Sequence, residues 1–395
     1  MFGLFAQLSA GGVIAILVSR HLGPEAKGYS TLLTIGPSII AWVVAMGLNP
    51  ATMYFTARSF DVSRLLTGSF VLAFVFGGLG TLLGWLALAP GVGVPAVHVA
   101  LAVALVLIAV QLLREFHGAA LLGLHRVAQY AQVTLAARLA GSILLVAAIY
   151  LVPVELFYLA IPISFALSNA FIVLAVRRIV RWRWAWQGSL LVEQLRYGLR
   201  SHLGDAVLVL LIRLDQFVVY VLFGATALGF YSVAALCADF LTQAGQAAGN
   251  LFFARVSRAG ERGPYLARLA VGSAALGLLG LAVPLILLAH PIVTILFGQG
   301  FDVAVGPWRL LALAGAAEGT SRVAGLALRA LGVPLLASLM NVAGLVLNLP
   351  LVIVFGIAYG LEGVALAMLL GDVVVLVIAC FALRSSRQRS FAAVP

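Results

Sequence analysis

The chain has 395 residues, of which 63% are hydrophobic and only 9% charged, and its mean hydropathy is +1.14. A soluble domain of this length needs a more polar surface, so the composition excludes that class. The net charge of +11 comes from basic residues scattered over short segments rather than from a basic soluble domain, which argues against nucleic-acid binding.

Runs of about 20 apolar residues, long enough to cross a bilayer as helices, recur along the whole chain. They predict an all-α polytopic membrane protein, because a β-barrel shows short alternating segments instead. We expect about twelve spans. Those of the first half lie near 2–19, 30–54, 65–88, 97–115, 127–150 and 157–176, and those of the second near 203–223, 230–254, 266–289, 304–324, 333–355 and 361–383.

Arginine placement predicts the orientation of these spans. The segments after the even-numbered spans and the C-terminal tail hold most of the 24 basic residues, Arg58, Arg114, Arg126 and Arg384 among them. The segments after odd-numbered spans hold only Arg20 and Lys27. Because basic residues concentrate on the cytoplasmic side, both termini are expected in the cytoplasm.

A polar segment, residues 177–202, separates the two sets of six spans. It contains RWRWAWQ, whose indoles and guanidinium groups suit the headgroup layer, and then LLVEQLRYGLR, an expected amphipathic interfacial helix. The predicted organisation is an N-terminal six-helix lobe (1–180), a cytoplasmic interfacial linker (181–202) and a C-terminal lobe with a short basic tail (203–395). The linker is interpreted mainly as a surface-lying connection; a specific lipid- or partner-binding role is the alternative.

The two halves contain a similar short segment. Residues 22–30 read LGPEAKGYS and residues 223–232 read FGATALGFYS, so Gly23 and Gly28 match Gly224 and Gly229 at a shift of 201 residues. Glycine allows turns that other residues do not, and a shared loop geometry is expected. With six spans in each half, both lobes enter the membrane in the same sense, which predicts a parallel repeat of the kind found in transporters.

Three stretches resemble the polysaccharide-transporter (Wzx-like oligosaccharide flippase) branch of the MOP flippase superfamily. They are SRHLGPEAKGYSTL, LIRLDQFVVYVLFGATALGFYSVA and HPIVTILFGQGFDVAVGPWRLLALA. The resemblance extends over about residues 10–383. It implies a MOP/MATE-like fold of two lobes around a central cavity, and export of lipid-linked oligosaccharide across the bacterial inner membrane.

Ionisable side chains within spans usually face a bundle interior or a water-filled cavity. Arg213, Arg138, Arg309 and Arg322 are candidates for binding a substrate diphosphate, because guanidinium matches phosphate oxygens in a bidentate geometry. The alternatives are structural ion pairs and snorkelling to an interface. Arg213 is expected to lie deepest in its span. Arg322 lies four residues after Glu318, a spacing that lets the two pair.

Asp215 is a candidate for cation coupling or for a structural contact. It lies two residues after Arg213, so the two side chains point about 160° apart on a helix and need separate partners. Asn341 and Asp372 are further candidates, and Asn348 lies seven residues after Asn341 on roughly the same helical face. We expect no cofactor beyond coupling to Na⁺ or H⁺, no metal site and no catalytic group.

The predicted function is a flippase for a polyprenyl-diphosphate-linked oligosaccharide, working by alternating access. Expected partners are this substrate, membrane lipids, and polysaccharide polymerase or glycosyltransferases. A MATE-type cation-coupled drug antiporter is the main alternative and predicts a cavity dominated by carboxylates. A membrane polymerase or ligase is disfavoured by the short outer segments, and a transport-inactive scaffold is the remaining alternative.

Overall fold

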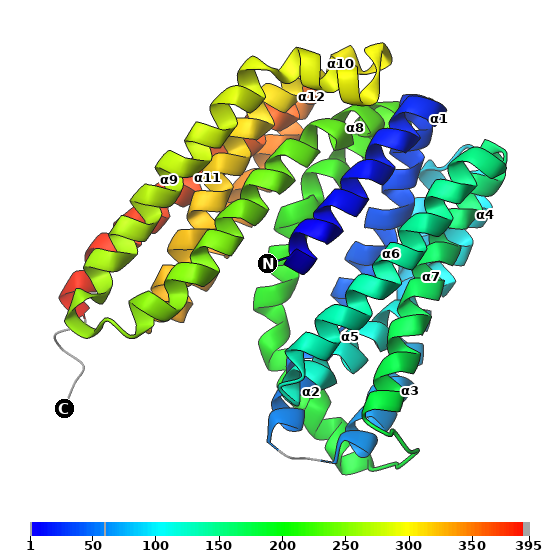
Figure 1. Ribbon diagram of the computed structural model, residues 1–395, viewed down its shortest axis with the longest axis vertical. Coiled ribbons are helices and arrows are strands. Elements are labelled where there is room, and N and C mark those ends of the chain that lie inside the picture. The colour runs from blue at the N-terminus through cyan, green and yellow to red at the C-terminus, as the bar shows by residue number, and fades with distance from the viewer. Residues whose placement is uncertain (1, 59–60, 390–395) are drawn as a thin grey trace. The chain divides into compact units, whose positions relative to one another are not determined.

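Figure 1 shows the computed structural model, which describes the backbone of residues 2–58 and 61–389. Side chains are described for residues 11–58, 61–199, 213–253, 255–260, 262–333 and 335–384. Every described element is an α-helix or a short 3₁₀ helix. A helix satisfies its own backbone hydrogen bonds, which is required where no water is present. The all-α prediction is confirmed.

Seven described helical segments are long and apolar enough to cross a membrane, or eight if the bent pair Gly11–Val44 and Leu48–Ala57 is one span. Two of them, Arg213–Ser257 and Leu335–Arg384, have 45 and 50 residues, about twice what one crossing needs. A glycine turn divides each of these two segments, and the same holds for the first helix. The predicted plan of about twelve spans in a multi-pass membrane protein is therefore confirmed.

The chain folds into two compact units, Met1–Val209 (unit 1) and Leu210–Pro395 (unit 2). Unit 1 contains α1 (Phe2–Val44), α2 (Leu48–Ala57), α3 (Val62–Leu88), η1 (Ala89–Gly91), α4 (Pro95–Val106), α5 (Ile108–Gly123), α6 (Val127–Leu151), α7 (Val154–Ile179) and the start of α8 (Gly188–Ser257). Local signals explain several helix starts. Asp61 accepts a hydrogen bond from the Ser63 N–H at 2.9 Å, and Pro95 is the first residue of α4.

The first turns of α8 pack on unit 1. Leu190 forms a buried cluster with Phe55 and Leu65, and Gln194 is fully buried beside Ser69. The division between the units falls later in α8, between Val209 and Leu210. The amphipathic segment predicted after RWRWAWQ is thus helical and begins at Gly188.

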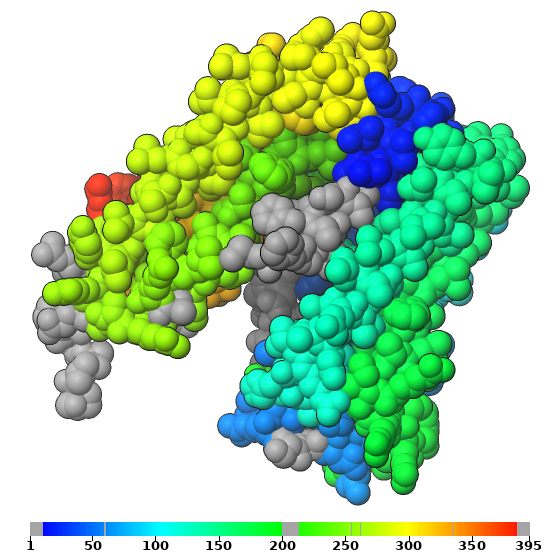
Figure 2. All heavy atoms as spheres, in the orientation of Figure 1, coloured from blue at the N-terminus to red at the C-terminus, as the bar shows by residue number. Residues whose placement is uncertain are grey.

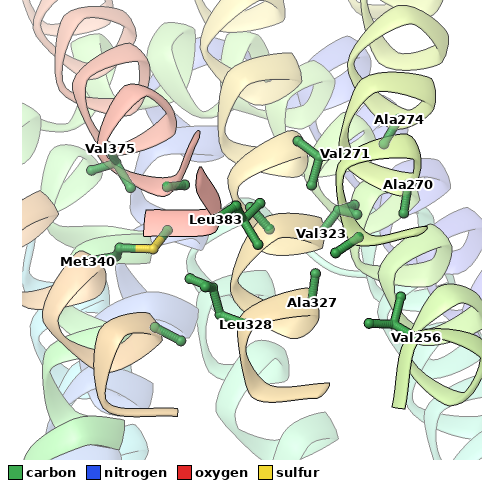
Figure 3. Packing of buried hydrophobic residues seen from close by; sticks show 14 residues of the cluster. Val256, Ala270, Val271, Ala274, Val323, Ala327, Leu328, Met340, Val375 and Leu383 are labelled. Carbon is green, nitrogen blue, oxygen red and sulfur yellow. The ribbon is translucent and has the colours of Figure 1, made fainter. Parts of the chain in front are cut away.

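Unit 2 contains the rest of α8, then η2 (Gly260–Arg262), α9 (Gly263–Leu287), α10 (Ala289–Phe297), η3 (Gln299–Ala304), α11 (Val305–Ala330) and α12 (Pro334–Arg389). α11 packs against both α9 and α12. Side chains from α8, α9, α11 and α12, such as Val256, Val271, Leu328 and Val375, build one apolar core (Figure 3). Many members are alanine or valine, which lets the helices approach closely.

The outer surface of α9 is apolar. Leu276 and Leu287 are 76% and 73% exposed, and the helix surface is visible in yellow-green in Figure 2. Leucine at such exposure is expected against lipid. By contrast, α11 is not apolar enough to be counted among the candidate spans of the described residues, although a helix occupies the predicted range.

Gly23 and Gly224 confirm the shared turn geometry. Gly23 has φ 81° and ψ −177°, and Gly224 has φ 81° and ψ −172°. This backbone region is adopted almost only by glycine. Gly360 divides α12 in a similar conformation, with φ 65° and ψ −144°. The internal repeat is therefore visible in the backbone of both units.

One sequence assignment is wrong. The sequence assigns Arg114 to the residues after a span, because it predicts that the fourth span ends near residue 115. The structure has a break at Leu107 and continues as α5 to Gly123. Arg114 therefore lies in the middle of a helix.

Candidate functional site

Unit 2 contains a cavity of about 90 Å³ between segments of α8, α11 and α12. Ionisable residues from all three helices line it: Arg213, Asp215, Asp239, Glu318, Arg322 and Asp372. Among the candidates named from sequence, the structure thus brings together Arg213, Arg322, Asp215 and Asp372.

Arg213 and Asp215 have separate partners, as their spacing predicted. The Arg213 Nη1 donates to Asp239 Oδ2 at 3.1 Å, and both side chains are about one-third exposed. Asp215 is buried, and its Oδ2 accepts a hydrogen bond from the Tyr231 hydroxyl at 2.9 Å. Asp239 and Tyr231 both follow the Gly224 turn, so folding back at this glycine supplies both partners.

Glu318 and Arg322 pair along α11, as their spacing predicted. Arg322 Nη2 donates to Glu318 Oε1 at 2.7 Å, and Nε donates to the same oxygen at 3.2 Å. The other oxygen, Glu318 Oε2, accepts from Thr242 Oγ1 at 3.0 Å. Thr242 was not identified from sequence, because one threonine in an apolar helix gives no pattern.

Asp372 on α12 is only 6% exposed, and its charged neighbours are Glu318, Asp215 and Arg322. Asn348 is beside it, 2% exposed, and a Cβ placed on Gly371 would collide with its side chain. Gly371 is thus needed for this close approach. Asn341, the other candidate, is half-buried and is not among the described residues that line the cavity.

Close backbone packing fixes the cavity walls. A Cβ on Gly315 would lie 2.6 Å from Ala238 Cα, and a Cβ on Gly319 would lie 2.9 Å from the Leu241 carbonyl oxygen. Contacts this short require glycine at both positions. α11 and the second part of α8 therefore meet backbone to backbone, which places Asp239 and Thr242 opposite Glu318.

The cavity contains more carboxylates than guanidinium groups. Arg213 and Arg322 are each in a salt bridge with one carboxylate, Asp239 or Glu318. Asp215 and Asp372 form no salt bridge with a described residue. Among the described residues, no group of three histidine, cysteine, aspartate or glutamate side chains is placed to hold a metal ion. The two buried carboxylates can instead bind a proton each, or contribute oxygens to a monovalent cation.

A second polar cluster lies in unit 1 and has the opposite balance. Glu115 is paired with the adjacent Arg114 and also accepts from Asn49 Nδ2 at 3.3 Å. Arg138 is within electrostatic reach of Arg114. Glu115 is therefore the carboxylate partner of Arg114, and Arg138 adds a second positive charge to the cluster. Arg114, Glu115 and Asn49 were missed because a charged pair at a predicted span end resembles an interfacial anchor.

Arg138 and Arg309 are exposed and form no ion pair or hydrogen bond with the side chains that the structure describes. Arg309 is in the second turn of α11, near a helix end. Arg138 is eleven residues from the start of α6, a helix of 25 residues, and so lies near the middle of its span. It is the deeper of the two.

A family model described as polysaccharide biosynthesis protein matches residues 17–306. The comparison with curated proteins found no match. A solved structure of the lipid II flippase MurJ has a TM-score of 0.79 and 13% identity, covering 99% of this chain and 90% of its own. An inward-facing multidrug resistance MATE transporter of the MOP superfamily has a TM-score of 0.76 and 17% identity, covering 98% and 96%.

A MOP superfamily transporter from Pyrococcus furiosus, described as having a binding pocket of reverse polarity, has a TM-score of 0.65 and 17% identity over 99% of this chain and 94% of its own. At 13–17% sequence identity, these structural similarities establish the fold of the chain. The family match extends over most of the sequence. The chain is therefore a multi-pass membrane protein of the polysaccharide biosynthesis protein family, with the fold of the MOP-superfamily transporters.

Proposed function

We propose that this protein is a flippase that moves a polyprenyl-diphosphate-linked oligosaccharide across the bacterial inner membrane by alternating access. The diphosphate binds arginine side chains in a water-filled path, the sugars follow through that path, and the polyprenyl tail stays in lipid. Both termini are cytoplasmic, as the arginine distribution predicts. The activity is transport and not catalysis.

The observation that carries this proposal is the position of Arg138, which lies exposed near the middle of α6 without an ion pair to a described side chain. An arginine at the centre of a lipid-facing helix costs several kcal/mol at least, and no described residue compensates its charge. A water-filled path that binds an anion removes this cost. Arg114 is paired with Glu115, so with Arg138 the cluster keeps a net positive charge that suits a diphosphate.

Arg213, Arg322 and Arg309 are further proposed contacts for the same substrate. The first two already have a carboxylate partner, and so contribute less net positive charge than Arg138. Arg309 has no described partner but lies near a helix end, where it binds a substrate entering or leaving the path.

Cation coupling is proposed for the unit 2 cavity. Asp215 and Asp372 are buried, unlike the exposed Arg138, and lack an arginine partner. One oxygen, Asp215 Oδ1, accepts no hydrogen bond from the residues described. A carboxylate in this state is stabilised by binding H⁺ or Na⁺, and a gradient of either ion then drives the conformational cycle. Asn341 remains a candidate outside the cavity lining.

A second function, cation-coupled export of small cationic molecules, is favoured by one observation: carboxylates outnumber arginines in the unit 2 cavity. The two functions predict opposite substrate charges. They also predict different partners, since only the flippase works with glycosyltransferases and a polysaccharide polymerase.

A competition experiment separates them. The full chain is reconstituted in vesicles with a fluorescent polyprenyl-diphosphate oligosaccharide, and outward movement is measured with and without a cationic dye in excess. The flippase predicts movement of the lipid-linked sugar and no inhibition by the dye. Dye export without movement of any of several lipid-linked sugars would support the antiporter instead.

A further inference from the structure

The segment RWRWAWQ, residues 181–187, has no part in the transport path proposed above, yet the structure holds it in a defined position. The Arg183 N–H donates to Ser63 Oγ at 3.3 Å, and the Ala185 N–H donates to Thr67 Oγ1 at 3.1 Å. Ser63 and Thr67 are one helical turn apart on α3, about 6 Å. Two residues of extended chain span nearly the same distance. Residues 183–185 therefore run along α3 in the same direction as the helix, and residues 181–187 are called the ribbon below.

Aromatic and cationic contacts fix the inner side of the ribbon. Trp182 stacks on Phe70, with ring centroids 6.3 Å apart, and Trp184 meets the same ring edge-on at 5.9 Å. The Arg177 guanidinium lies 4.4 Å from the centroid of Trp182. Its Nε donates to His117 Nε2 at 3.4 Å, which ties the ribbon to α5.

The outer side of the ribbon is basic and aromatic. Arg181 and Arg183 are exposed, and Trp184 and Trp186 are 59% and 54% exposed. No aspartate or glutamate occurs from residue 156 to residue 192. The carboxylate at the start of α3, Asp61, is already paired with Arg64 at 3.3 Å. The exposed arginines therefore have an uncompensated positive charge.

The depth of the ribbon matches the boundary of a bilayer. α3 has 27 residues and is about 40 Å long, which exceeds a hydrocarbon core of about 30 Å. Its first turns, where the ribbon lies, are at the headgroup layer. Because residues 183–185 run inward along α3, Arg183 lies nearer the water and Trp184 lies deeper, against Phe70. At the end of the ribbon, Gln187 Oε1 accepts a hydrogen bond from Arg64 Nη1 at 3.0 Å, which keeps this end at the first turn of α3. A phospholipid has the same order, with phosphate outside and acyl chains inside.

We propose that Arg181 and Arg183, with Trp184 and Trp186, form a binding site for the headgroup of an anionic phospholipid. The guanidinium groups contact the phosphate and the anionic headgroup, and the indoles pack on the upper acyl chains. Bound lipid fixes the segment that joins α7 to α8 within unit 1. The site is independent of the transported substrate.

The test uses the full chain in vesicles of phosphatidylglycerol and phosphatidylcholine, with bromine on the acyl chains of one lipid at a time. Three of the six tryptophans, Trp182, Trp184 and Trp186, lie in the ribbon. The part of the tryptophan quenching that W184L/W186L removes therefore reports which lipid lies at the ribbon. The relative association of the two lipids is measured for the wild type, for R181Q/R183Q, and for R255Q/R258Q. The last variant removes two exposed arginines from unit 2 that have no tryptophan beside them in sequence.

We expect the wild type to prefer phosphatidylglycerol, and R181Q/R183Q to lose this preference by about 25-fold, or about fivefold per arginine. R255Q/R258Q should keep it within about twofold. Equal quenching by both lipids in the wild type would overturn the proposal, as would an equal loss in both variants. W184L/W186L gives a second readout: quenching should fall for both lipids while the preference remains.

Discussion

The two units contain polar clusters of opposite charge balance. In unit 1, Arg114 is paired with Glu115, and Arg138 is a second guanidinium group that has no ion pair with a described side chain. In unit 2, two arginines face four carboxylates around a cavity, and both arginines are paired. An uncompensated guanidinium group attracts an anion, and an uncompensated buried carboxylate attracts a cation or a proton. On the function proposed above, substrate binding belongs to unit 1 and ion coupling to unit 2.

The largest expected effect is on transport by Arg138→Gln. Loss of one charge-assisted contact to phosphate should lower the rate of oligosaccharide flipping by about 10- to 100-fold. Stability should not change, because Arg138 has no ion pair or hydrogen bond with the described side chains. Flipping in reconstituted vesicles and thermal unfolding in detergent measure the two effects. Arg138→Lys keeps the charge but not the paired N–H donors of the guanidinium group, and should retain part of the rate. A full rate in Arg138→Gln would exclude this residue from substrate binding.

Next in size is the effect of Asp372→Asn on ion coupling. An amide cannot take up a proton and binds Na⁺ more weakly, so the acceleration of flipping by an imposed Na⁺ or H⁺ gradient should fall roughly tenfold, or about 1.4 kcal/mol. The matched control is Asp302→Asn, which alters a carboxylate that is 58% exposed on η3. It should leave the gradient response intact. An unchanged response in Asp372→Asn would assign Asp372 a structural role.

Substitutions at the two glycine turns test whether the repeated turn contributes equally to the free energy of unfolding in both units. Gly23→Ala and Gly224→Ala should each lower the free energy of unfolding by about 1–3 kcal/mol, because alanine is strained at φ 81°. Gly272→Ala, on an exposed helical position with open space around it, should be neutral or slightly stabilising. Denaturant unfolding in detergent measures all three. A large difference between the first two would show that the repeats differ energetically.

The smallest expected effect concerns the Glu318–Arg322 pair. A double-mutant cycle with Glu318→Gln and Arg322→Gln should give a coupling free energy of about 0.5–1 kcal/mol. The reason is that the pair is partly buried and two nitrogens of Arg322 donate to the same oxygen of Glu318. No coupling would mean that Arg322 is as available for substrate as Arg138, which would weaken the contrast between the units.

Features set by local spacing could be predicted from the sequence. The Gly23 and Gly224 match at a shift of 201 residues predicted a shared turn, and the four-residue spacing of Glu318 and Arg322 predicted their pair. The separate partners of Arg213 and Asp215 also followed from helical geometry. Each of these depends on the period of a helix or on the special backbone of glycine.

Contacts between helices could not be predicted in this way. Tyr231 bonds to Asp215, and Thr242 bonds to Glu318, because the Gly224 turn and the close approach at Gly319 bring separate segments together. Arg114 was misplaced because the break at Leu107 has no glycine or proline to mark it. Asn341 and Asn348 were equivalent by spacing, and only the packing on Gly371 shows that Asn348 is beside Asp372.

The central claim is that an arginine of unit 1 recognises the charge of the lipid carrier. The most direct measurement compares wild type and Arg138→Gln with two substrates that carry the same sugar, one on polyprenyl diphosphate and one on an uncharged lipid. We predict that the substitution slows the charged substrate by about 10- to 100-fold and leaves the uncharged substrate nearly unaffected. Equal slowing of both substrates, or of neither, would contradict the account.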